Sequence, residues 1–186
     1  MVAFRRRYHE NKQLLFVCKY IVDIIMVIVA AYVLVSFIAY RDTNVGNSMN
    51  SVLNDEDTVL INRYAYTLTS PDRYDIIAFN VEGVNSSKIY IKRVIGLPGE
   101  TVLISDGKVY INGEELKDDV VDTEILTAGL ASTSITLEKD EYFVLGDNRN
   151  NSEDSRFSSI GTVKADNILG KVWFILNPIK RIKFVS

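Results

Sequence analysis

Histidine and cysteine are almost missing from this 186-residue chain, which contains one of each. Both stand near its start, as His9 and Cys18. A single cysteine cannot form a disulfide within the chain. The residues after Cys18 can supply neither a Ser-His-Asp triad nor a thiol nucleophile, and a zinc site built on histidine is excluded there as well.

Acidic residues outnumber basic residues in most of the chain, and the formal net charge is -3. The first 40 residues carry five basic and two acidic residues, which gives +3, so the remaining 146 residues carry −6. An acidic domain lacks the basic patches that nucleic-acid phosphates require. We therefore expect no nucleic-acid partner.

One long run near the N-terminus, residues 24–40, has no charged residue, and its extension back to Tyr20 includes only Asp23. A helix of this length, at about 1.5 Å per residue, spans the roughly 30 Å hydrocarbon core of a bilayer. A cleaved signal peptide has a shorter apolar core. A helix that packs on the core of a small soluble domain keeps a polar face, whereas this run is apolar nearly all round. An uncleaved transmembrane anchor is therefore favoured over these two alternatives.

Basic residues precede the apolar run and predict its orientation under the positive-inside rule. They are Arg5, Arg6, Arg7, Lys12 and Lys19. The predicted organisation is a basic cytoplasmic segment over 1–19, a single-pass anchor over 20–40 and an extracellular domain over 41–186. The chain is accordingly expected in the plasma membrane.

Beyond residue 41, short β-branched and aromatic runs alternate with turn residues, which is typical of strands. Such runs occupy 58–61, 75–79, 89–95, 142–145 and 171–176. Asp106-Gly107 separates two further runs and is a strong β-hairpin signal. The pattern predicts a mainly β fold, an antiparallel coiled or barrel-like sheet. A small inserted lobe is expected over about 114–140, where the sequence is more polar.

The leading hydrolytic chemistry left for this domain is a serine nucleophile with a lysine base. One S-x-x-K tetrapeptide, Ser105 to Lys108, straddles the predicted hairpin turn and lacks the S-D-N and K-T-G partners of penicillin-recognising enzymes, so we interpret it as structural. The acidic stretch 147–154 lacks the glycine that a calcium loop needs at its sixth position. We expect no metal site and no cofactor.

Three longer stretches are more specific. They read Val45-Gly-Asn-Ser-Met-Asn50, Tyr90-Ile-Lys-Arg-Val-Ile-Gly-Leu-Pro-Gly-Glu100 and Gly146-Asp-Asn-Arg-Asn-Asn-Ser-Glu-Asp-Ser-Arg156. In content and order they resemble the serine, lysine and C-terminal boxes of type I signal peptidases, particularly Gram-positive ones. An N-terminal anchor precedes the boxes in that family too, and the resemblance covers most of residues 12–176.

The resemblance implies a serine endopeptidase in which Ser48 is the nucleophile and Lys92 is the general base. Lys92 must be neutral to accept a proton, which requires burial to lower its pKa from about 10.4. The Ser48 backbone N–H would donate a hydrogen bond to the oxyanion. Gly46 stands where many family members have a serine, which leaves a second oxyanion donor undefined.

Six further residues match supporting or substrate-binding positions of the family. Ser152 matches a serine that holds the lysine by a hydrogen bond, and Asp154 with Arg156 matches a structural ion pair beside the site. The residues that match the lining of shallow substrate pockets are Met49, Tyr90 and Ile91. Such pockets suit the small side chains that the family prefers before its cleavage point.

The serine box departs from the family pattern just after the nucleophile. The family usually reads S-M-x-P-T, whereas Ser51 and Val52 replace the proline and threonine in this chain. No catalytic group is lost by this change. The leading prediction is removal of signal peptides, with exported preproteins and the lipid bilayer as partners. The alternative is a catalytically weak or specialised member that acts as a substrate-binding or assembly scaffold for surface proteins; a self-cleaving Ser/Lys protease is disfavoured by the anchor.

Overall fold

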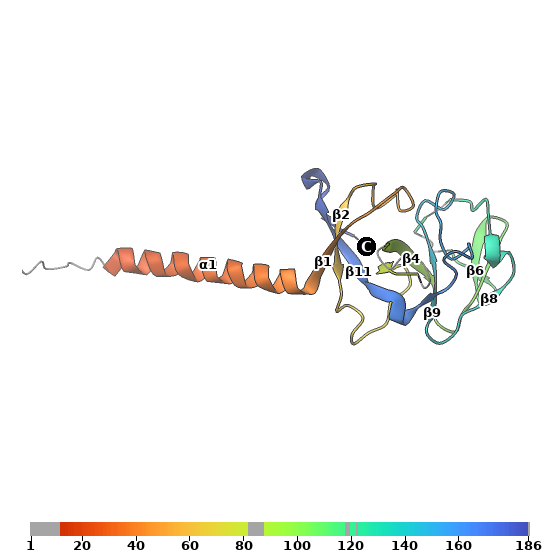
Figure 1. Ribbon diagram of the computed structural model, residues 1–186, viewed down its shortest axis with the longest axis horizontal. Coiled ribbons are helices and arrows are strands. Elements are labelled where there is room, and N and C mark those ends of the chain that lie inside the picture. The colour runs from red at the N-terminus through yellow and green to blue at the C-terminus, as the bar shows by residue number, and fades with distance from the viewer. Residues whose placement is uncertain (1–11, 82–87, 118–119, 122, 186) are drawn as a thin grey trace, which may run out of the picture. The chain divides into compact units, whose positions relative to one another are not determined.

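The chain divides into a helical unit, Met1–Ile38, and a β unit, Ala39–Ser186 (Figure 1). The computed structural model describes residues 12–81, 88–117, 120–121 and 123–185, and within the helix it describes the side chains of 15–33. Most of the predicted cytoplasmic segment, including Arg5, Arg6, Arg7 and His9, lies outside the described residues.

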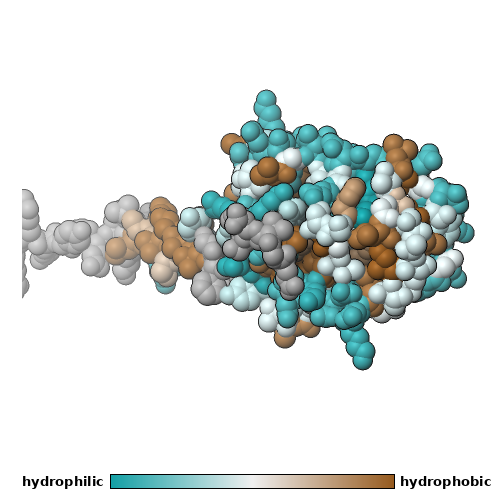
Figure 2. Space-filling view, turned by 45° about the vertical axis from the view of Figure 1, so that its right-hand side comes forward, coloured by the Kyte–Doolittle hydropathy of each residue, from teal (hydrophilic) through white to brown (hydrophobic). Residues whose placement is uncertain are grey.

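The helical unit consists of α1, Lys12–Ile38. Its stretch Leu15–Val33 has a mean hydropathy of 2.2 and is long and apolar enough to cross a membrane, and apolar side chains cover it in Figure 2. The helix ends two residues before the expected boundary at 40. Ala39 and Tyr40 instead begin β1, because their backbone joins a ladder with β2, and a tertiary ladder overrides local helix propensity.

The β unit is built on one antiparallel sheet, with strand order β1-β2-β11-β3-β4-β9-β10 and with β12 paired to β11. Its strands are β1 Ala39–Thr43, β2 Thr58–Asn62, β3 Ile76–Phe79, β4 Tyr90–Gly96, β9 Glu141–Leu145, β10 Val163–Lys164, β11 Ile168–Asn177 and β12 Lys183–Phe184. Short 3-10 turns, η2 Ala165–Asn167 and η3 Ile179–Arg181, flank β11. The predicted mainly β architecture with one N-terminal apolar helix is confirmed.

A second, smaller antiparallel sheet has the order β7-β6-β5-β8. It contains β5 Thr101–Ser105, β6 Lys108–Ile111, β7 Glu114–Glu115 and β8 Ile135–Thr136, with a 3-10 turn η1 at Gly129–Ser132. Asp106 and Gly107 have φ of 50° and 74°, as a tight two-residue hairpin requires. The sheet begins earlier in the chain than the lobe expected at 114–140, because the β5–β6 hairpin belongs to it.

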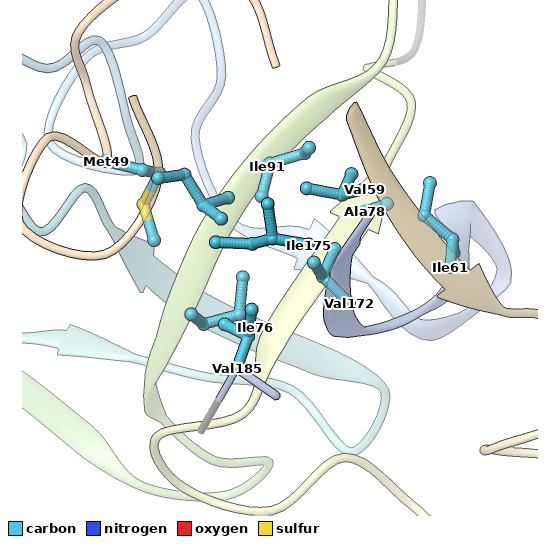
Figure 3. Close-up of a cluster of buried hydrophobic side chains, with 10 residues drawn as sticks. Met49, Val59, Ile61, Ile76, Ala78, Ile91, Val172, Ile175 and Val185 are labelled. Carbon is cyan, nitrogen blue, oxygen red and sulfur yellow. The ribbon is translucent and has the colours of Figure 1, made fainter. Parts of the chain in front are cut away.

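The main core lies against the inner face of the large sheet (Figure 3). Its buried members are Met49, Leu53, Val59, Ile61, Ile76, Ala78, Ile91, Val172, Ile175 and Val185. Met49 and Leu53 come from the loop between β1 and β2 rather than from a strand. Because both are fully buried, they anchor that loop to the sheet on either side of Ser51.

Gly96 lies where the two sheets meet, and it yields a test of this packing. A Cβ at this position would stand 2.7 Å from Val102 Cγ2, 2.8 Å from Leu137 Cδ1 and 2.9 Å from Phe143 Cβ. Overpacking of this kind costs about 1–3 kcal/mol, so Gly96→Ala should lower the free energy of unfolding by that amount in denaturant titrations of the detergent-solubilised chain. The exposed loop substitution Ser134→Ala is the control, and equal stability of the two variants would contradict the packing described.

Candidate active site

Ser48 and Lys92 are brought into hydrogen-bond contact by the fold. Ser48 lies in the loop between β1 and β2, and Lys92 lies on β4. The Lys92 Nζ donates to Ser48 Oγ at 2.7 Å and to the Ile91 carbonyl at 3.1 Å. Residues 44 positions apart in the sequence therefore form one polar pair, whose geometry permits proton transfer between the hydroxyl and the amine.

Lys92 is buried because of where its strand lies. β4 is an interior strand, paired with β3 on one side and β9 on the other, and every residue from Ile91 to Gly96 is buried. Only 4% of Lys92 is exposed. Burial lowers the pKa of Lys92 to about 8, against the opposing field of Asp154 and with help from the positive charge of Lys88. Roughly a tenth of the amine is then neutral at pH 7.

A cleft of about 450 Å³ opens onto this pair. Its walls are residues 42–45, at the end of β1, and residues 88–92, at the start of β4; Ser48 and Glu153 complete it. Two of the three expected substrate-binding residues, Tyr90 and Ile91, line this cleft. The third, Met49, is not among its lining residues.

Met49 occupies the core instead of the cleft. It is fully buried in the cluster drawn in Figure 3, and its sulfur accepts the Asp147 N–H at 3.5 Å. Ser48 reaches Lys92 while the next side chain packs beside Ile91, so consecutive residues of the loop serve different purposes. Met49 therefore helps to fix the loop that carries Ser48.

Ser152 differs from the expectation that it holds Lys92. Its hydroxyl is buried and has no hydrogen-bond partner in the part of the chain that the structure describes, whereas the Lys92 amine donates to Ser48 and Ile91. A Cβ at Gly146 would collide with the Ser152 hydroxyl and lie 2.6 Å from the Ser48 carbonyl oxygen. Gly146 thus allows these two segments to approach closely.

Asp154 and Arg156 form a buried bidentate ion pair, with both N–O distances at 2.8 Å. Asp154 also accepts the Gly146 N–H at 3.0 Å. Arg156 donates to the Thr127 carbonyl at 3.1 Å, which links the loop to the segment around η1. The pair is therefore a brace for the loop 146–156, which carries Ser152 and Glu153 beside the cleft.

A second buried ion pair, between Arg93 and Asp147, received no role in the sequence analysis. Its two N–O distances are also 2.8 Å, and its side chains are 1% and 0% exposed. Arg93 donates further to the Tyr74 carbonyl at 2.8 Å. Both residues lie inside the recognised boxes, but only the fold shows that they pair across 54 positions. The pair joins β4 to the loop 146–156 directly beside Lys92.

The nucleophile loop is attached to this second ion pair. The Asn148 N–H donates to the Ser48 carbonyl at 3.0 Å, and the Ser51 hydroxyl donates to Asp147 Oδ2 at 3.3 Å. Ser51 is the residue that replaces the family proline. Its side chain therefore supplies a tertiary tether at a position where proline would restrict the backbone locally.

Comparison with known proteins identifies the family. The family model described as "Signal peptidase, peptidase S26" matches residues 17–177. The chain belongs to this family. It is 32% identical over 155 residues to "Probable signal peptidase I-2" of Synechocystis sp., covering 81% of this chain and 69% of that protein. It is 35% identical over 146 residues to "Signal peptidase I T" of Bacillus subtilis, covering 74% of each.

A solved signal peptidase I from Enterococcus faecalis is also similar to part of the chain. It is 37% identical, with a TM-score of 0.44, and the match covers 59% of this chain and 98% of that structure. The resemblance to type I signal peptidases drawn from the sequence boxes is confirmed by the family match.

The two classes of ion pair in the β unit should differ in their effect on stability. Asp147→Ala leaves the Arg93 guanidinium buried without its partner, which typically costs about 3–5 kcal/mol. Glu115→Ala breaks the Lys108–Glu115 pair, whose side chains are 57% and 35% exposed, and should cost at most about 1 kcal/mol. Denaturant titration of the two detergent-solubilised variants measures the difference, and comparable losses would contradict a structural role for the Arg93–Asp147 pair.

Proposed function

We propose that this chain is a membrane-bound serine endopeptidase that removes N-terminal signal peptides from exported preproteins, with Ser48 as nucleophile and Lys92 as general base. The observation that carries the catalytic assignment is the 2.7 Å contact between the buried Lys92 amine and the Ser48 hydroxyl. Membership of the signal peptidase family supports the reaction and the class of substrate.

The acylation step follows from this contact. Neutral Lys92 takes the Ser48 proton as the Ser48 oxygen attacks the carbonyl carbon before the scissile bond. The oxyanion that forms accepts a hydrogen bond from the Ser48 backbone N–H, which has no acceptor within the described residues. Protonated Lys92 then gives its proton to the departing amine, which is the new N-terminus of the exported protein. The signal peptide remains as an ester on Ser48.

Hydrolysis of the ester reverses the direction of proton transfer. Lys92, neutral again after the amine has left, accepts a proton from a water molecule that attacks the ester carbonyl. The tetrahedral intermediate collapses, the Ser48 oxygen recovers a proton from Lys92, and the signal peptide leaves with a free carboxylate. One group thus acts as base and acid in both steps, which requires a pKa close to the working pH.

The cleft suits an extended peptide. One wall is the end of the edge strand β1, and the other is the start of β4, where residues 90–92 pair with β3 but not with β9. Both walls therefore offer backbone groups for strand-like pairing. Tyr90 and Ile91 face this space together with Ser48. We assign these two residues to substrate binding, and Met49, Ser152, Asp154 and Arg156 to support of the catalytic loops.

Membrane attachment would keep the catalytic unit on the membrane that exported preproteins cross. The apolar stretch within α1 supports a single-pass anchor over 20–40, with residues 1–19 cytoplasmic and the catalytic domain 41–186 on the outer face of the plasma membrane. Partners are then signal-peptide-bearing preproteins and the bilayer, and the acidic balance of the domain gives no reason for a nucleic-acid partner. The scaffold alternative is not favoured, because the named relatives are signal peptidases.

Removing either member of the Ser48–Lys92 pair should abolish cleavage. Ser48→Ala and Lys92→Met should each lower kcat by at least about 10³-fold on a preprotein, because the nucleophile or its base is lost. N-terminal sequencing of the product identifies the cut. The second serine–lysine pair, Ser105 and Lys108, supplies matched controls, since Ser105→Ala and Lys108→Met should leave the rate unchanged. Full activity of either first variant would refute the assignment.

The reaction should depend on pH through Lys92. Because burial lowers its pKa to about 8 and only the neutral amine accepts a proton, kcat/KM should rise roughly tenfold per pH unit below that value and level off above it. A pH–rate profile on a preprotein whose own groups do not titrate in this range measures the midpoint. A flat profile between pH 6 and pH 9 would show that another group serves as the base.

A further inference from the structure

The catalytic cleft contains one carboxylate to which the proposed mechanism gives no role. Glu153 lines the same cleft as the catalytic pair and is exposed. The other two acidic residues of its loop, Asp147 and Asp154, are buried and paired with arginines. Glu153 belongs to no ion pair among the described residues. Its charge is therefore free to interact with a charged group of the substrate.

The Glu153 carboxylate is held in position by a neutral donor. The Ser159 hydroxyl donates to Glu153 Oε1 at 2.7 Å. A hydroxyl group orients a carboxylate but does not cancel its charge. The neighbouring Asp154 is fixed by its ion pair with Arg156, so the backbone that carries Glu153 is braced as well. Glu153 thus presents its negative charge from a defined position.

The other charged residues of the cleft do not offset Glu153. Asp42 and Lys88 lie on opposite walls and carry opposite charges, so together they contribute no net charge. Lys92 must be neutral when it accepts the Ser48 proton. In the reactive state the net charge of the cleft is therefore that of Glu153.

The loop that carries Glu153 approaches the catalytic pair at Ser48. The Asn148 N–H donates to the Ser48 carbonyl at 3.0 Å, which joins this loop to the nucleophile. In the proposed function the two walls, 42–45 and 88–92, bind the peptide before the scissile bond. The peptide after that bond then leaves past Ser48, on the side where the loop with Glu153 closes the cleft.

Glu153 also acts electrostatically on the reacting groups. Burial is the largest influence on Lys92 and lowers its pKa; among the carboxylates that raise this pKa, Asp154 comes first and Glu153 second, ahead of the buried Asp147. Solvent weakens the effect of an exposed charge steeply with distance. An exposed carboxylate that still acts on Lys92 must therefore lie near the bond that is cleaved.

We propose that Glu153 is a specificity-determining residue that reads the charge of the first two residues after the scissile bond. Preproteins whose mature part begins with lysine or arginine are preferred, because Glu153 attracts them. Those that begin with aspartate or glutamate are disfavoured by repulsion. This inference rests on the proposed function, since it concerns the same cleft and the same reaction.

Three forms of one preprotein test the preference. They carry two lysines, two glutamines or two glutamates after the scissile bond; both positions are changed because side chains of an extended peptide alternate in direction. The detergent-solubilised full-length chain should cleave the lysine form with a kcat/KM at least about threefold above that of the glutamate form, as an exposed charge contact allows. High salt should reduce this ratio. Equal kcat/KM values for the three forms would overturn the proposal.

Substitution of Glu153 tests which residue is responsible. Glu153→Gln should remove the preference for the lysine form, and Glu153→Lys should reverse it. Glu138→Gln removes the same charge at an exposed position outside the cleft and should keep the ratio of the unaltered chain. A Glu153→Gln variant that keeps the ratio, or a Glu138→Gln variant that loses it, would overturn the proposal.

A pH–rate profile on the glutamine form gives a second readout. Glu153→Gln should lower the pH midpoint, because the charge it removes raises the pKa of Lys92; loss of a merely structural contact would not have this effect. An unchanged midpoint would overturn the proposal, because it would place Glu153 too far from the catalytic pair. If Glu153→Lys does not fold, Glu153→Gln decides alone.

The outcome separates this inference from the proposed function. A chain that cleaves all three forms at equal rates, and loses cleavage in Ser48→Ala, defeats the role of Glu153 alone. A chain that cleaves none of them, or a Ser48→Ala variant that still cleaves, refutes the proposed function and this inference with it.

Discussion

The buried amine of Lys92 is the constraint on which the surrounding arrangement depends. Lys92 lies on β4, which has a neighbouring strand on each side. Lowering its pKa from 10.5 to about 8 corresponds to roughly 3 kcal/mol against the charged form. No exposed lysine would accept a proton from a serine at neutral pH. The fold must therefore place Lys92 on a buried strand, β4, beside a cleft. Neighbouring charges must also not raise the pKa of Lys92 back to its usual value.

The two buried ion pairs beside Lys92 are consistent with that requirement. Arg93 pairs with Asp147, and Arg156 pairs with Asp154, so each pair balances its own charge. The carboxylates can therefore brace the loop 146–156 while their guanidinium partners offset much of their electrostatic effect on Lys92. Asp154 still raises the pKa of Lys92, but burial exceeds that effect. A brace built on unpaired carboxylates would stabilise the ammonium form and leave Ser48 without a base.

Much of this organisation could be predicted from the sequence, because its signals are local. The apolar run, the Asp106-Gly107 hairpin and each of the three boxes occupy short, continuous stretches of the sequence. What the sequence could not reveal depends on contacts between distant segments. The residues around Lys92 do not alternate between apolar and polar, because both faces of β4 are buried. Tyr40 belongs to β1 rather than to the helix, because β2 pairs with it.

The positions of side chains within a box were the least predictable part of the site. Adjacent residues of the serine box diverge, since Ser48 meets Lys92 and Met49 enters the core, and a motif does not state which way a loop residue points. Ser152 stands next to the site with a hydroxyl that meets no partner among the described residues. The Ser152 hydroxyl packs closely against Gly146. No spacing in the sequence predicts this contact.

The missing proline of the serine box is best understood through the same contacts. A proline stiffens a turn by fixing one backbone angle, but here the turn is closed by hydrogen bonds from the Val52 and Leu53 amides to the Met49 carbonyl at 3.0 and 2.8 Å. Buried Met49 and Leu53 secure it from below, and Arg181 secures it through the Val52 carbonyl. Several tertiary contacts already hold the loop that carries Ser48, so the loss of one local restraint need not displace the nucleophile. The chain can therefore depart from the family pattern at Ser51 and keep the geometry of the Ser48–Lys92 pair.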